Sequence, residues 1–124
     1  MPDFTPTTAR EAVMVFHFAD RMKSELLIAS RLLGALGGLR DQELAGGQKI
    51  FMEYLRGLEG EAALGQSLIG DQEMVRVRTV LTGLVGMVEG GPLHEIQSHL
   101  TWVLTTMTTY AQRAMEYLLN QKLL

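Results

Sequence analysis

The feature that most constrains the fold is a run of apolar residues spaced alternately three and four positions apart. The run comprises Ala12, Val15, Ala19, Met22, Leu26, Ala29, Leu33 and Leu36. Such spacing keeps an apolar stripe on one side of an α-helix, as in the seam between packed helices. The opposite face is polar at intervals of seven, at Arg10, His17, Ser24 and Arg31. We therefore predict an amphipathic helix over about residues 9–36.

Glycine-containing breaks divide the chain into four segments with this periodicity. The breaks are Gly37–Gly38, Gly70–Asp71 and Gly90–Gly91, the last followed by Pro92. The three later helices are predicted over about residues 41–69, 72–89 and 92–121. A strand is the alternative for residues 101–110, where threonine and aromatic residues gather, but the seam continues on both sides. Short connections favour antiparallel neighbours, so we predict an all-α, antiparallel four-helix bundle with long first and last helices.

Polar residues at the predicted helix starts can satisfy free backbone N–H groups. Thr8 and Glu11 have the spacing of a capping box. Asp41 and Asp71 each stand directly before or at the start of an apolar run and are predicted N-caps. These residues fix where we expect three of the four helices to begin.

Five glycines interrupt the second predicted helix, at Gly46, Gly47, Gly57, Gly60 and Gly65. Each costs up to about 1 kcal/mol relative to alanine in a helix interior. Two interpretations follow from the sequence. The helix kinks or breaks near Gly57–Gly60, or a neighbouring helix approaches closely at these positions.

Length and charge bound the organisation of the chain. Its 124 residues predict one domain, residues 1–124, in which Pro2 and Pro6 bracket a loose tail over residues 1–7. The 11 basic and 14 acidic residues give a net charge of -3, which argues against a nucleic-acid partner. There is no long apolar run and no leader-like start. We therefore expect no membrane span and a cytoplasmic location.

No arrangement of residues predicts a catalytic site, so we expect a protein that is not an enzyme and carries no cofactor or metal. The chain has no cysteine. His94 and His99 are five residues apart, about 140° around a helix, so they are unsuited to binding one metal ion together. A small-molecule or metal-binding bundle is kept as an alternative, with Glu53, Glu59 and Glu61 joining one of these histidines.

Apolar residues exceed what the predicted seams require. Charged residues make up 20% of the chain, below the usual value of about 25%. The residues that lie beside or outside the seams and are predicted to form an interface are Met14, Phe18, Ile28, Trp102, Met115 and Leu119. Aromatic residues and methionine are enriched at interface cores, although Trp102 could instead pack within its own chain.

This surplus leads to two functional hypotheses. The first is a non-enzymatic helical interaction module that forms a homo-oligomer, with a dimer favoured, through the first and fourth helices. The second is a chaperone or adaptor whose groove accepts the amphipathic helix of a protein partner.

Overall fold

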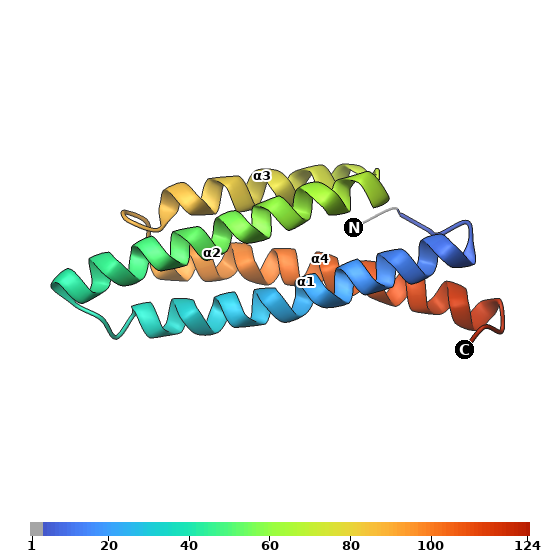
Figure 1. The fold of residues 1–124 in the computed structure, drawn as a ribbon, viewed down its shortest axis with the longest axis horizontal. Coiled ribbons are helices and arrows are strands. Elements are labelled where there is room, and N and C mark those ends of the chain that lie inside the picture. Colours follow the sequence, from blue (N-terminus) through green and yellow to red (C-terminus); the bar gives the residue numbers. More distant parts are fainter. Residues whose placement is uncertain (1–3) are drawn as a thin grey trace.

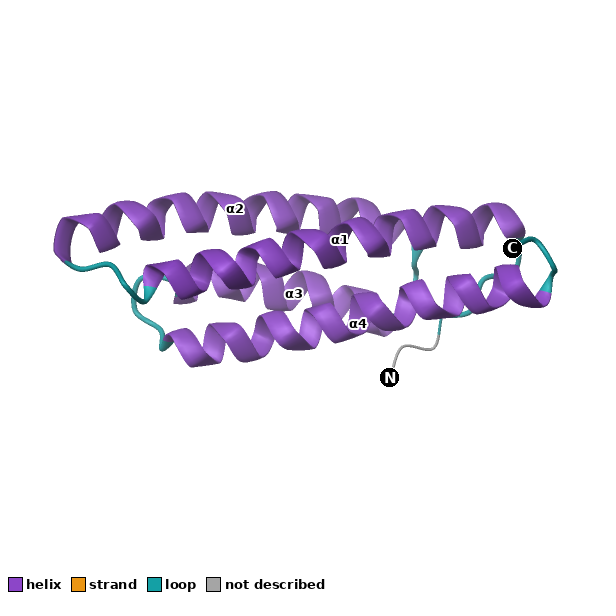
Figure 2. Ribbon diagram, turned by 90° about the horizontal axis from the view of Figure 1, so that it is seen from below, coloured by secondary structure: helices purple, strands orange, loops and turns teal. Residues whose placement is uncertain are grey.

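The computed structural model describes residues 4–124, which form four antiparallel helices (Figure 1). The helices are α1 (Ala9–Leu36), α2 (Asp41–Leu68), α3 (Gln72–Met87) and α4 (Leu93–Asn120). Short loops join them, as Figure 2 shows. Each helix packs on two neighbours in the cyclic order α1, α2, α3, α4, and among the described residues no Cα atoms of the diagonal pairs lie within 8 Å of each other. The predicted bundle is confirmed, with helix ends within two residues of those expected.

The predicted seams meet in one continuous core. All eight seam residues of α1 are buried, as are Met74, Val77 and Leu81 of α3. In α4 the seam is buried from Ile96 to Ala114 and only half-buried at its ends. Each large aliphatic side chain that is fully buried stabilises the fold by about 1.5–3 kcal/mol. The three-and-four alternation thus decides which side of each helix faces inward.

Two of the predicted caps are confirmed. The backbone N–H of Glu11 donates to Thr8 Oγ1 at 3.1 Å, and that of Met74 donates to Asp71 Oδ1 at 3.0 Å. The Glu11 carboxylate accepts from the backbone N–H of Thr7 at 2.8 Å, which completes a capping-box arrangement one residue earlier than expected.

The predicted N-cap at Asp41 is wrong. Arg40 takes the N-cap position, but its side chain makes no hydrogen bond that caps the helix, and Asp41 is the first residue of α2, with φ of 54°. Aspartate tolerates this left-handed conformation better than most residues, which suits it to the turn into α2. The Arg40 guanidinium donates to the carbonyl oxygens of Gly37 (3.1 Å) and Leu39 (2.8 Å), and these bonds hold the loop between α1 and α2.

The second helix runs unbroken through Gly57 and Gly60. Close approach explains two of its other glycines. A Cβ at Gly65 would lie 2.0 Å from Cζ of Phe18, and one at Gly47 would lie 2.8 Å from the side chain of Leu36. Gly46, Gly57 and Gly60 have no such neighbour within 4 Å, so packing within the chain does not account for them.

The loose tail predicted for residues 1–7 lies partly outside the described residues, which begin at Phe4. The described part is held against α4. Arg113 donates to the carbonyl oxygen of Phe4 at 3.0 Å, and the Tyr117 hydroxyl donates to that of Thr7 at 3.1 Å. This segment is therefore packed, because α4 offers donors for its backbone carbonyls.

Candidate functional site

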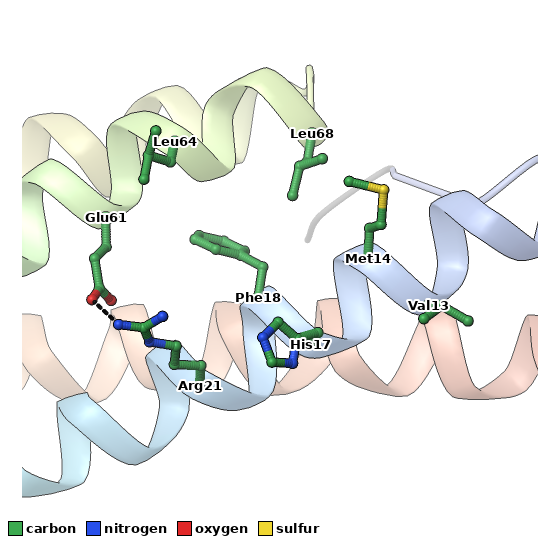
Figure 3. A pocket seen from close by; sticks show the side chains of 8 residues that line it. All are labelled: Val13, Met14, His17, Phe18, Arg21, Glu61, Leu64 and Leu68. Carbon is green, nitrogen blue, oxygen red and sulfur yellow. Dashed lines mark hydrogen bonds and ion pairs between the residues drawn. The ribbon is translucent and has the colours of Figure 1, made fainter.

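A groove of about 390 Å³ opens between α1 and α2 on the outside of the bundle (Figure 3). Its size falls within the range of about 300–1,000 Å³ that is usual for binding sites. The apolar residues that line it are Val13, Met14, Phe18, Leu64 and Leu68. His17, Arg21 and Glu61 supply its polar side chains. The groove is thus apolar along most of its length, with a charged pair at one end.

Phe18 and Gly65 determine how closely the two helices approach beneath this groove. The phenyl ring occupies the space beside Gly65 that a Cβ would need. Phe18 is half-buried, whereas Leu64, which directly precedes Gly65 in α2, is 71% exposed. In Figure 3 the Met14 and Leu68 side chains point toward each other beyond the ring. The groove is therefore shallow, with a floor that is fixed by the packing of Phe18.

At the polar end of the groove, Arg21 and Glu61 form a cluster with Glu25, which lies just beyond the lining residues. Arg21 bonds Glu61 and Glu25, each at 3.0 Å. Burial raises the pKa of Glu61, and the adjacent Glu25 raises it further, whereas Arg21 lowers it. Tyr54 donates its hydroxyl to the backbone carbonyl of Glu25 at 2.9 Å. This cluster joins α1 to α2 and leaves an excess of negative charge when both carboxylates are ionised.

Three residues of α2 form an outward line. Ile50, Gly57 and Leu64 are spaced seven apart, which places them on one side of the helix. Ile50 is 72% exposed and Leu64 is 71% exposed, more than any other large apolar side chain in the described residues. The line is apolar at both ends and has no side chain in the middle.

A similar line of outward-facing residues runs along α1. It consists of Met14, Arg21, Ile28 and Ala35, which are also spaced seven apart. Met14 lines the groove together with Leu64. At the other end of the helices, Ala35 lines a smaller hollow of about 170 Å³ together with Ile50. The two lines therefore lie side by side, and we call the surface that they form the α1–α2 face.

The six residues predicted for an interface do not gather on one surface. Met14 and Phe18 line the groove, and Ile28 is exposed on the same line of α1 as Met14. Trp102 lies elsewhere: it is half-buried against the core, and the Arg76 guanidinium of α3 is 5.6 Å from its ring centroid. Trp102 thus packs within its own chain, which was the alternative interpretation of this residue.

The remaining two predicted residues lie near the C-terminal end of α4. Met115 is half-buried and Leu119 is 53% exposed. Ile50 and Leu64 were missed, although their spacing of seven outside the α2 seam was a signal.

The ligand set of the metal-binding alternative is not brought together. The set comprises Glu53, Glu59, Glu61, His94 and His99. Its carboxylates are on α2 and its histidines on α4, and these helices lie diagonally across the bundle. Within residues 4–124 there is no group of three or more histidine, aspartate or glutamate side chains that could hold a metal ion.

Comparisons with protein-family models, curated proteins and solved structures gave no match to this chain. None of the helices in the described part of the chain combines the length and apolar character needed to cross a bilayer.

Proposed function

We propose that this chain is a non-enzymatic helical interaction module that self-associates through its α1–α2 face. The observation that supports the proposal is the exposure of Ile50 and Leu64 beside an apolar groove. Burying each of these side chains against a partner would contribute about 1.5–3 kcal/mol of transfer free energy. Contiguous exposed apolar surface that is rimmed by charge is typical of interaction sites.

The dimensions of the face favour a second copy of the chain as the partner. Each of the two helices has 28 residues and is therefore about 42 Å long. Two adjacent helices present a surface roughly 20 Å wide, or about 840 Å² in projection. A stable protein interface buries about 800 Å² on each partner, so this face alone is large enough for a dimer.

The exposed side chains indicate that α2, and not α4, forms the interface together with α1. Among the described residues, α2 carries the two most exposed large apolar side chains. The large apolar side chain of α4 that is exposed is Leu119, at the end of the helix. The expected pairing of the first and fourth helices is thereby revised to α1 with α2.

The test is the solution mass, measured by light scattering after size exclusion. We expect the unmodified chain to be a dimer and the Ile50→Asp/Leu64→Asp variant to be a monomer with unchanged helicity by circular dichroism. Both residues are exposed, so the substitutions leave the core intact. Val75→Asp is the matched control, because Val75 is 43% exposed on α3, away from this face.

Two outcomes would contradict the proposal. A monomeric mass for the unmodified chain at tens of micromolar would rule out self-association, and would favour a partner's amphipathic helix as the occupant of the groove. A dimeric mass for the double variant would show that the interface lies on another face.

A further inference from the structure

Resting on the self-association proposed above, we infer that the dimer is antiparallel, with its two-fold axis beside Gly57. In this arrangement Ile50 of each protomer packs against Leu64 of the partner subunit. The inference starts from the order of side chains along α2. Ile50 and Leu64 stand seven residues to either side of Gly57, so the line is large, small, large in both directions. A two-fold axis requires such a self-complementary order.

Gly57 gives the closest approach for the two α2 helices. Nothing in the chain lies within 4 Å of the position where its Cβ would be. Gly65, by contrast, is filled by the Phe18 ring. An open glycine in a helix interior destabilises it by up to about 1 kcal/mol and permits a neighbouring backbone to come close. Ile50 and Leu64, each over 70% exposed, would flank that contact and cover it from water.

The α1 line has its midpoint at the same level. Arg21 is level with Glu61, to which it is bonded. The helices are antiparallel, so Gly57, four residues before Glu61, is level with Glu25, four residues after Arg21. The midpoint of the α1 line falls beside Glu25. A two-fold axis that crosses α2 at Gly57 therefore also crosses the midpoint of the α1 line. Nothing in the sequence of α2 requires the two midpoints to lie at the same level.

The pairs that this axis creates between the two α1 lines are compatible in size. Met14 would meet Ala35 of the partner subunit, again a large residue against a small one. Ile28 would meet the aliphatic stem of the partner's Arg21. That guanidinium stays bonded to Glu25 and Glu61 within its own chain, because an arginine can bury its stem while its charged head remains paired.

Disulfide cross-linking tests the axis directly, because the chain has no cysteine of its own. Gly57→Cys should cross-link with its own copy, since a disulfide needs Cα atoms about 4.4–6.8 Å apart. Ile50→Cys or Leu64→Cys alone should not, because the two copies of either residue would lie about 21 Å apart along the helices. A mixture of the two variants should yield the mixed disulfide. Gly83→Cys, at an open glycine of α3, is the control that should stay uncrosslinked.

The outcomes separate the two proposals when the masses of the unmodified chain, Ile50→Cys and Leu64→Cys are also measured under reducing conditions. A reduced dimer with these cross-links supports both. A reduced dimer in which Ile50→Cys cross-links with itself, or in which the Gly57→Cys and mixed disulfides fail to form, overturns the antiparallel axis and leaves self-association standing. A monomeric mass for the unmodified chain overturns both.

Discussion

The Phe18 ring lies where Gly65 would carry a Cβ, with its Cζ atom 2.0 Å from that position. This contact brings α1 and α2 together under the groove, and Gly65 is a buried core position of α2. The two residues are 47 positions apart in the chain, and neither the phenylalanine nor the glycine alone signals the contact. It fixes the level of one helix against the other, and hence the geometry of the α1–α2 face.

We expect Gly65→Ala to lower the free energy of unfolding by about 1–3 kcal/mol, because the added methyl group forces Phe18 out of its position. Chemical denaturation measures the change. Gly60→Ala is the matched control: it has open space around it and should be neutral or stabilising by up to about 1 kcal/mol. Combining Gly65→Ala with Phe18→Ala should cost less than the two single changes together. Strict additivity would mean that the two residues do not touch.

A second prediction concerns Tyr110, whose side chain is fully buried. Its hydroxyl donates to Asp71 Oδ1 at 2.5 Å, while the same oxygen accepts from the backbone N–H of Met74 and caps α3. Tyr110→Phe should reduce the free energy of unfolding by about 1.5–3 kcal/mol, the usual range for a hydrogen bond to a charged group. Tyr117→Phe removes an exposed hydrogen bond to Thr7 and should cost less. Equal losses for the two variants would contradict the argument.

Tyr110 also gives a prediction at alkaline pH. Burial, the hydrogen bond to Asp71 and the charge of that carboxylate raise the pKa of Tyr110 above its ordinary value of 10.0. A raised folded-state pKa stabilises the protein below the unfolded-state pKa, and that contribution is lost as the pH rises above about 10. Denaturation between pH 8 and 11 should therefore show a steeper loss in the unmodified chain than in Tyr110→Phe. Parallel curves would show that Tyr110 has no perturbed titration.

Glu61 should influence stability in the acidic range. Burial, reinforced by Glu25, raises the pKa of Glu61 above its ordinary value of 4.5. The stabilising contribution of this group is complete below that value and is lost as the pH rises through the folded-state pKa. Glu61→Gln should abolish this dependence between about pH 4 and 7, with a small effect because the carboxylate is partly exposed. Glu53→Gln, which changes an exposed carboxylate on the same helix, should keep the slope of the unmodified chain.

The parts of the structure that the sequence predicted are those decided within one helix. The seam from Ala12 to Leu36 determines an inward side by spacing alone, and Asp71 caps the helix that directly follows it. The outer surface depends on which helices become neighbours. Trp102 was expected at an interface, and nothing within its own helix indicates that its half-buried ring lies beside Arg76 of α3.

The same reason explains why the α1–α2 face could not be predicted. Ile50 and Leu64 show a spacing of seven, yet the lines of α1 and α2 form one surface only because Phe18 and Arg21 set the two helices side by side. The packed segment from Phe4 likewise depends on donors more than 100 residues away in α4. Contacts over such separations leave no local pattern in a single sequence.

The glycine at the proposed axis gives a prediction in which folding and association change in opposite directions. Gly57→Ala should raise the intrinsic stability of the helix by up to about 1 kcal/mol, because no atom of the chain occupies the space that its Cβ would enter. In the dimer, the new methyl groups would force the two backbones apart, so we expect the dissociation constant to rise at least about tenfold, or about 1.4 kcal/mol. Sedimentation equilibrium over a dilution series measures this constant.

Gly83→Ala is the matched control, since Gly83 is equally open but lies on α3. It should bring a similar gain in helix stability with no change in association. If both alanine variants dimerise as tightly as the unmodified chain, then the two α2 backbones do not meet at Gly57. If both weaken the dimer, then α3 also takes part in the contact and the interface extends beyond the α1–α2 face.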